Sequence, residues 1–229
     1  MNFTRPLLLL ALLVFVPGGC RRPAPLPETI EVHHLNYQVS YLEDKAGEIP
    51  TRILPKQMEA YFSRHYIYTR IEGFFKQFSL TQVADLKRRQ VTTMLHFFGT
   101  KVYYSGKPGE LPAGVISPKK LSFSRTGLHK TIGGLDSEHI IARMDDGSFD
   151  FYFTDDFSIR RPNINTPYQE LSKPLTVFRI RLSELDMLLT CKAYEFTNIS
   201  GDLLKVPAGY KPVSKASMED IINSLFTKD

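Results

Sequence analysis

The sequence has 229 residues, of which 42% are hydrophobic and 23% charged, and its formal net charge is +5. This length allows one large or two small domains with a sizeable hydrophobic core, and all-β domains of this size are commonly single. The basic residues occur as scattered pairs and not as one stripe, which argues against a nucleic-acid-binding surface.

The N-terminal segment has the pattern of a bacterial secretion signal. A basic residue precedes an uninterrupted apolar run over residues 7–16, and two glycines precede Cys20. A membrane-spanning helix needs roughly 20 apolar residues, and this run is about half as long. Small residues before a cysteine resemble a bacterial lipobox, although Pro17 stands where such boxes usually carry leucine. We therefore predict a signal peptide over residues 1–19 and lipidation of Cys20; the alternative is an ordinary secretory signal with an incidental cysteine.

The segment after the signal is rich in proline over residues 21–28 and lacks apolar periodicity, which predicts a short, stiff tether. We assign residues 20–29 to the lipidated cysteine and this tether, and residues 30–229 to a single domain. With Cys20 lipidated, Cys191 has no disulfide partner within the chain. Its apolar surroundings predict a buried thiol and not a nucleophile.

The domain begins with an alternating pattern over residues 30–42. This pattern predicts a strand with Leu35, Tyr37, Val39 and Tyr41 facing a core. Residues 56–71 fit two structures, because their apolar residues match a helical stripe while their content of Tyr, Phe, Ile and Thr favours strands. We favour two strands, connected at residues 63–65.

Further strands are predicted along the rest of the chain. They cover residues 74–84, 90–98, 101–104, 139–144, 149–154, 175–182 and 187–198. Asp145 to Ser148, with Asp-Gly at its centre, predicts a tight turn that makes a hairpin of two of these strands.

Two long segments, residues 105–120 and 155–173, contain proline with glycine or asparagine and predict loops, of which the first is a candidate rim or lid. Near the C-terminus, a short helix is predicted with Ser217 as its N-cap and with Ile221, Ile222, Leu225 and Phe226 as its apolar stripe. Strands dominate and no βαβ alternation occurs, so we predict a mainly β fold with an antiparallel sheet.

Three patches, residues 54–58, 126–134 and 206–211, carry a family likeness. Together they resemble an uncharacterised family of Gram-negative lipoproteins related to the LolA/LolB-like fold, over residues 30–215. The resemblance implies a curved antiparallel sheet that forms an incomplete barrel around an apolar concavity, with helices as a lid. The chain departs from the family at Asp136-Ser137, near where many members carry a cysteine, so a cysteine-dependent activity is not carried over.

The aromatic stripes on the predicted strands have two interpretations, as ordinary core or as the lining of a cavity that contacts an acyl chain. The candidate lining residues are Phe74, Phe78, Leu95, Phe97, Phe149, Phe151, Phe153 and Phe178. Curling a sheet around a ligand or a lid is one way to bury the 16 phenylalanines and 11 tyrosines of the chain.

No catalytic, metal or cofactor motif occurs. The sequence lacks a G-x-S-x-G elbow, a phosphate-binding loop and an H-E-x-x-H pair. His33 and His34 are adjacent, so on a strand they point to opposite faces and cannot easily hold one metal. The acidic residues around the 145–148 turn fail the spacing of an EF-hand loop. We predict no enzyme activity and no cofactor.

These observations predict a non-catalytic lipoprotein that binds a hydrophobic or lipid-like ligand in an open β-barrel. The alternative is an accessory subunit of an outer-membrane protein complex, with residues 105–120 and 155–173 as its contact surface. In either case we expect the protein to contact a membrane through its lipid anchor. Further partners would be a hydrophobic ligand or outer-membrane proteins, but no nucleic acid. Arg21-Arg22 after the cysteine resembles neither surface-export nor inner-membrane retention signals, so we expect the periplasmic face of the outer membrane.

Overall fold

A computed structural model describes residues 26–46, 49–73 and 75–225. The predicted signal peptide, Cys20 and Phe74 lie outside these residues. The strands are β1 Thr29–Tyr41, β2 Lys45–Ala46, β3 Ile49–Pro50, β4 Gln57–Phe62, β5 Tyr66–Gly73, β6 Phe78–Asp85, β7 Gln90–Phe97, β8 Thr100–Ser105, β9 Val115–Ile116, β10 Leu121–Ile132, β11 Leu135–Met144, β12 Gly147–Thr154, β13 Leu175–Leu182, β14 Leu185–Ser200 and β15 Lys211–Pro212. The helical elements are the 3₁₀ turns η1 Thr51–Ile53 and η2 Gly201–Leu204 and the α-helix α1 Lys215–Ser224.

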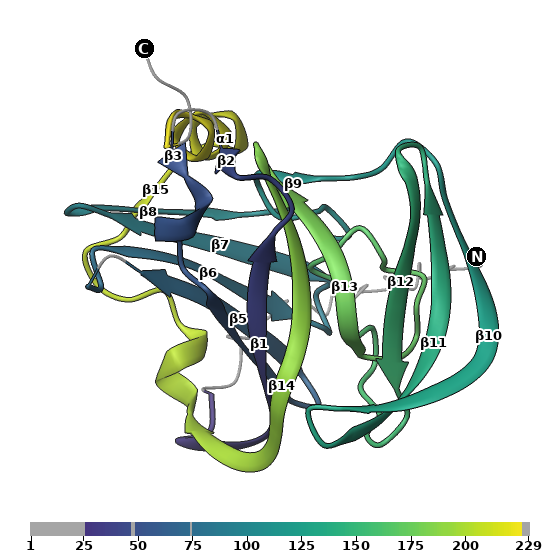
Figure 1. The fold of residues 1–229 in the computed structure, drawn as a ribbon. Helices are drawn as coiled ribbons and strands as arrows, with labels where there is room; N and C mark the ends of the chain where they lie inside the picture. Colours follow the sequence, from purple (N-terminus) through teal and green to yellow (C-terminus); the bar gives the residue numbers. More distant parts are fainter. Residues whose placement is uncertain (1–25, 47–48, 74, 226–229) are drawn as a thin grey trace, which may run out of the picture.

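One large curved sheet dominates the described part of the chain. Its strands follow the order β10-β11-β12-β13-β14-β1-β4-β5-β6-β7-β8-β15, with β9 paired to β13. In Figure 1, β1 and β14 stand near the centre, β4 to β8 extend to the left and β10 to β13 to the right. All neighbours are antiparallel except β8 and β15. The predicted mainly β fold, a curved antiparallel sheet that does not close into a barrel, is therefore confirmed.

Register shifts help to curve the sheet. β1 and β14 change register between Asn36 and Tyr37, and β12 and β13 between Tyr152 and Phe153. An extra residue in one strand bends it and increases its twist, so such positions help an open sheet to wrap around its core. β12 and β13 pair only around the second shift, which lets the two strands diverge towards one end.

The ambiguous segment over residues 56–71 forms β4 and β5, so the strand interpretation is confirmed and the helical one is wrong. Ser63 makes the connection, because its Oγ accepts a hydrogen bond from the backbone N–H of Tyr66 at 2.9 Å and donates one to the Tyr66 carbonyl. Met58, Ala60 and Phe62 are buried on one face of β4. Burial along β4 thus alternates with a period of 2, as a half-buried strand requires.

One strand was missed by the sequence analysis, and one helix cap was predicted wrongly. β10 was not predicted as a strand, because most of its side chains are exposed and it lacks alternating apolar residues. Helix α1 has Ser214 as its N-cap, and not Ser217, since the Oγ of Ser214 accepts a hydrogen bond from the Ser217 N–H at 3.1 Å. Met218 and Ile222 are the buried residues of this helix, and Phe226 lies outside the described residues.

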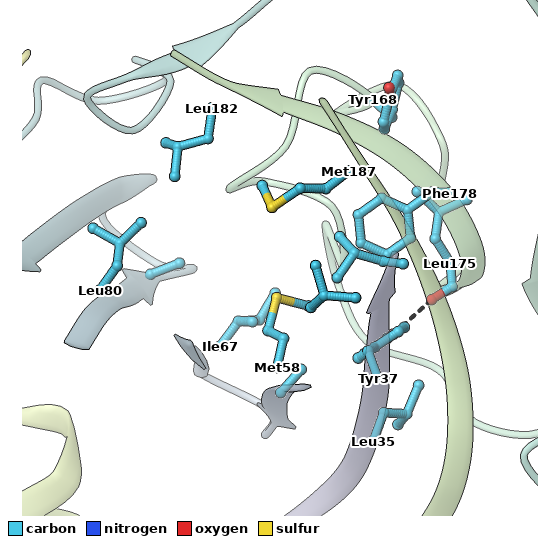
Figure 2. Packing of buried hydrophobic residues seen from close by; sticks show 14 of the residues in the cluster. Leu35, Tyr37, Met58, Ile67, Leu80, Tyr168, Leu175, Phe178, Leu182 and Met187 are labelled. Atoms are coloured by element: carbon cyan, nitrogen blue, oxygen red, sulfur yellow. Dashed lines mark hydrogen bonds between the residues drawn. The ribbon is translucent and has the colours of Figure 1, made fainter. Parts of the chain in front are cut away.

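The hydrophobic core fills the concave side of the sheet (Figure 2). Leu35, Tyr37 and Val39 are buried there as predicted, whereas Tyr41 is half-buried. The Tyr37 hydroxyl donates a hydrogen bond of 2.6 Å to the carbonyl of Leu175, which joins β1 to β13 across the core. A buried hydroxyl with a partner avoids the desolvation cost of an unpaired one.

The predicted loop over residues 155–173 contains no helix or strand and folds into this concave side. Asn165 donates hydrogen bonds to Gln82 on β6 and to Thr69 on β5, at 3.1 and 3.4 Å. Tyr168 lies against Phe151 with ring centroids 5.0 Å apart, and its hydroxyl donates to the Arg179 carbonyl on β13. The loop therefore connects the two arms of the sheet from within.

The predicted rim or lid over residues 105–120 is fixed to the sheet by Glu110. The carboxylate accepts hydrogen bonds from the Tyr104 hydroxyl at 2.8 Å and from the Lys107 N–H at 2.7 Å, and pairs with Lys215 on α1 at 3.0 Å. The Lys107 N–H is the main cause that lowers the pKa of Glu110 to about 2. The loop and the helix are thus held together by one carboxylate.

Replacing Glu110 with glutamine should lower the free energy of unfolding by about 1–3 kcal/mol at neutral pH, because charge-assisted hydrogen bonds are lost. The pKa of Glu110 is depressed in the folded state, so its contribution is present above the ordinary value of 4.5 and is lost as the pH falls through about 2. Urea unfolding over this range should show a smaller acid-induced loss for the variant than for the parent. Glu184→Gln, at an exposed site, is the control, and parallel pH curves for Glu110→Gln and the parent would contradict the expectation.

Candidate functional site

The most apolar cavity in the described part of the chain lies at one end of the open barrel. Its volume is about 290 Å³, close to the lower end of the roughly 300–1,000 Å³ typical of small-molecule sites. Its lining is apolar and includes Ile49, Leu54, Phe78, Phe97, Leu185 and Leu225. The one hydroxyl among the lining side chains, that of Tyr41, already donates to the Pro55 carbonyl at 2.6 Å. We call this space the outer cavity.

A second space of about 60 Å³, the inner cavity, adjoins the outer one. The two share Ile71, Leu80, Leu182 and Met187 as lining residues, so together they extend from the end of the barrel into its core. Leu80, Leu182 and Met187 project from different strands into the same space in Figure 2. An apolar chain that enters the outer cavity would therefore point towards the inner one.

The inner cavity also carries polar groups. Thr69, Gln82 and Thr93 occupy matching positions on β5, β6 and β7, and the first two line the cavity with Asn165. The hydroxyl of Thr93 is buried and makes no hydrogen bond to the residues described. Polar side chains of the protein are thus available to a ligand at the inner end of the space, whereas the side chains at the outer end are apolar apart from Tyr41.

Exposed apolar side chains surround the opening of the outer cavity. Ile53 and Phe98 line the cavity and are still 55% and 64% exposed. Phe75, between β5 and β6, is 100% exposed and lies on the hairpin next to that of Phe98. Leu42, which follows β1, is 46% exposed at the same end. Soluble proteins rarely expose several large apolar side chains together without a function.

The structure divides the predicted cavity residues among several places. Phe78 and Phe97 line the outer cavity and Phe178 lines the inner one. Leu95 and Phe151 are fully buried in the core. The phenylalanines of β12 lie in the part of the sheet formed by β10 to β13. There, Phe149 lies under the Arg179 guanidinium at 4.1 Å and Phe153 lines a separate, open cavity. Phe74 lies outside the described residues.

The sequence interpretation missed several cavity residues, notably Ile53 and Phe98 at the opening and the buried Met187 between the two cavities. Phe98 had a usable signal, because it directly precedes Gly99 at the predicted end of a strand, where a large apolar side chain has no core to face. Nothing in the sequence marks Ile53 or Met187 as cavity residues, because their position depends on how the sheet curves.

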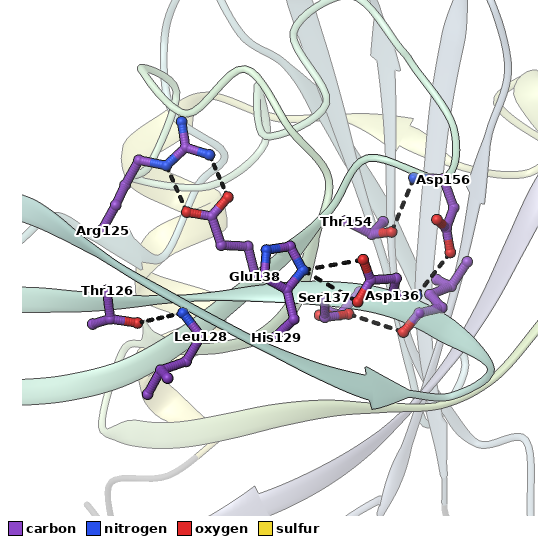
Figure 3. A network of polar contacts seen from close by, with 11 residues as sticks. Arg125, Thr126, Leu128, His129, Asp136, Ser137, Glu138, Thr154 and Asp156 are labelled. Carbon is purple, nitrogen blue, oxygen red and sulfur yellow. Dashed lines mark hydrogen bonds and ion pairs between the residues drawn. The ribbon is translucent and has the colours of Figure 1, made fainter.

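A polar network on β10 and β11 is the largest alternative site (Figure 3). Arg125 forms a two-point ion pair with the buried carboxylate of Glu138, whose pKa is lowered chiefly by this hydrogen bonding. His129 pairs with Asp136 at 3.0 Å on the exposed side. Ser137 is buried, donates to the Leu135 carbonyl and accepts from Thr176, so no base is placed to activate it. The arrangement lacks the nucleophile and base that covalent catalysis needs.

Cys191 is buried, and His33 and His34, neighbours on β1, each stack on an aromatic ring. Burial raises the pKa of the Cys191 thiol to about 11, so the thiolate needed for reaction is scarce at neutral pH. His33 stacks on Phe157 at 4.2 Å and His34 on Tyr61 at 4.3 Å, on opposite faces of β1. Within the described ranges, no group of three or more His, Cys, Asp or Glu could hold a metal ion. No helix among those residues is long and apolar enough to cross a membrane.

These features define a mainly β protein whose open, curved sheet encloses an apolar cavity. No protein-family model and no curated protein sequence matches the chain. Two solved structures of PNGF-II, in its C2 and P21 crystal forms, resemble it, each with a TM-score of 0.52 and 11% sequence identity. They cover 84% of this chain, which spans only 32% and 33% of the PNGF-II chains. At this identity the similarity supports the fold alone.

Proposed function

We propose that the chain is a lipid-anchored lipoprotein that holds a hydrophobic or lipid-like ligand in its open barrel and performs no covalent chemistry. The apolar lining of the outer cavity, open at one end of the barrel, carries this proposal. Burying a methylene group there contributes roughly 0.8 kcal/mol, so a short alkyl chain suffices for measurable affinity after the cost of association. The resemblance of the sequence to LolA/LolB-like lipoproteins supports the same proposal.

The anchor in this proposal is an acylated Cys20, which tethers the domain to the periplasmic face of the outer membrane. It rests on the sequence of residues 1–22, with the small residues before the cysteine and the arginine pair after it. Metabolic labelling with a palmitate analogue in a Gram-negative host should mark the protein, and the label should disappear in Cys20→Ala. Persistent labelling of that variant would contradict the anchor.

Binding to the cavity can be measured with N-phenyl-1-naphthylamine, an uncharged probe whose fluorescence rises in apolar surroundings. We expect saturable binding of one probe per chain. Ile53→Asp should weaken it by at least about tenfold, because a carboxylate at the opening loses hydration when the probe enters. Leu128→Asp is the matched control, since Leu128 is 65% exposed on β10 and lines neither cavity. Unsaturable binding, or equal effects of the two substitutions, would contradict the proposal.

A further inference from the structure

Three protruding side chains at the opening, Ile53, Phe75 and Phe98, form what we call the docking rim. They belong to η1 and to the connections β5–β6 and β7–β8, three separate segments that meet at one end of the sheet. Figure 1 shows β6, β7 and β8 extending to the left, beyond the β2–β3 pair. The three are respectively 55%, 100% and 64% exposed. No other segment of the described chain covers them.

The backbone at the two hairpin tips holds these rings outward at a conformational cost. Phe75 has φ of 52° and Phe98 has φ of 42°, a left-handed region that bulky residues rarely adopt. Glycine or asparagine would fit both positions with less strain. In both turns the next residue also has positive φ, as in the tight turns that hairpins favour, so phenylalanine in place of the usual Gly, Asn or Asp is the uncommon feature of each tip.

Each member of the docking rim has an exposed cation near it in the sequence. Arg52 precedes Ile53, Lys76 follows Phe75, and Lys101 lies three residues after Phe98. None of these three cations forms an ion pair with another residue that the structure describes. Glu72, the acid on the adjoining end of β5, is already paired with Arg70. The docking rim therefore combines apolar groups with unneutralised positive charge.

This combination identifies the occupant. A stable contact with a second copy or a folded partner buries roughly 1,200–2,000 Å² over a continuous surface, whereas the rim presents separate side chains with like charges between them. The boundary of a bilayer accepts aromatic rings at headgroup depth, while anionic headgroups attract Lys and Arg beside them. Glu43 and Asp44 follow Leu42 and lie beside η1, because their carbonyls accept hydrogen bonds from Thr51, so the unopposed positive charge of the rim is that of Lys76 and Lys101 on the two hairpins.

We propose that the docking rim inserts into the surface of a bilayer that contains anionic lipid, independently of the N-terminal anchor. The opening of the outer cavity would then meet the acyl layer directly, and a ligand could pass between bilayer and cavity without crossing water. The docking stands on the rim alone; the passage of a ligand rests on the proposed function. A membrane is thus a partner of the folded domain as well as of its lipid.

The chain contains no tryptophan, so a single introduced tryptophan reports its own surroundings alone. The mature chain, residues 20–229 with Cys20→Ala, is mixed with vesicles of phosphatidylcholine, alone or with phosphatidylglycerol, in three versions: Phe75→Trp, Phe98→Trp and, as control, Phe196→Trp. Phe196 is 58% exposed on β14, at the opposite end of that strand from the opening. Brominated acyl chains quench a tryptophan that has entered the bilayer.

We expect a blue-shifted emission and quenching by brominated lipid at positions 75 and 98 but not at 196, with the larger effect on vesicles that contain phosphatidylglycerol. Adding Lys76→Glu and Lys101→Glu should reduce vesicle binding by about tenfold or more, at roughly 1 kcal/mol per cation removed and further repulsion from each acid introduced. Equal quenching at all three positions, or none, would overturn the proposal. Probe binding without vesicles, measured on the same proteins, distinguishes failure of docking from failure of the ligand cavity.

Discussion

Replacing Arg179 with methionine should lower the free energy of unfolding by about 3–5 kcal/mol, the largest loss we expect from one substitution. The Arg179 side chain is 8% exposed; its Nε donates to Asp186 at 2.6 Å and its Nη2 to Asp146 at 2.7 Å. Its guanidinium also lies 4.1 Å from the centre of the Phe149 ring. Without it, the buried carboxylate of Asp186 keeps its desolvation cost and loses its counter-charge.

The position of Arg179 explains why the loss should be large. β12 and β13 pair only around residues 152–153 and 175–177, and beyond that point the sheet divides. Arg179 joins the tip of the β11–β12 hairpin, through Asp146, to β14, through Asp186. The ion pairs therefore replace the missing strand pairing between β12 and β13.

Urea unfolding of Arg179→Met and of a matched control, Arg181→Met, tests this expectation. Arg181 lies on the same face of β13 but is exposed, so its loss should cost less than about 0.5 kcal/mol. Arg179→Met combined with Asp186→Leu should recover much of the stability, because no uncompensated charge is left buried. If both single variants unfold at the same urea concentration, the ion pairs do not hold the β11–β12 hairpin to β13 and β14.

Replacing Leu80 with tryptophan should weaken ligand binding strongly while leaving the fold intact. Leu80 lines both the outer and the inner cavity, so a larger side chain there fills the space where the two adjoin. We expect the affinity for N-phenyl-1-naphthylamine to fall at least about tenfold, with a change in unfolding free energy below about 1.5 kcal/mol, since empty space receives the ring.

The control for Leu80→Trp is Leu128→Trp, which adds the same side chain at an exposed position on β10. Its probe affinity and its unfolding free energy should match those of the parent. Undiminished binding by a correctly folded Leu80→Trp protein would place the probe site elsewhere on the molecule, because both cavities would then be blocked without effect.

Local patterns predicted much of the sheet, because burial on one face of a strand leaves a period of 2 in the sequence. Leu35, Tyr37 and Val39 show this plainly, and the turn after Met144 was recognisable from its Asp-Gly pair. β10 was not predictable in this way, since most of its side chains remain in solvent at the edge of the sheet. The cap of α1 was displaced by three residues because Ser214 and Ser217 are equally good capping residues in sequence.

The cavity was less predictable than the strands. Alternation shows that Phe149, Phe151 and Phe153 share a face, but it cannot show which arm of a curved sheet that face meets. Phe151 packs on Tyr168 and Phe153 lines an open cavity beside Glu170, whereas Phe78 and Phe97 reach the outer cavity. Exposed positions such as Phe75 and Phe98 leave no periodic signal, so only the structure brings them to one opening.

Native mass spectrometry of residues 20–229 with Cys20→Ala, which carry no acyl anchor and are purified from their host cells without detergent, tests the ligand cavity most directly. The proposed function predicts a non-covalent adduct with the mass of one amphiphile per chain, which is lost in Leu80→Trp and retained in Leu128→Trp. A bare chain mass under these conditions, together with no uptake of added lipid, would contradict it.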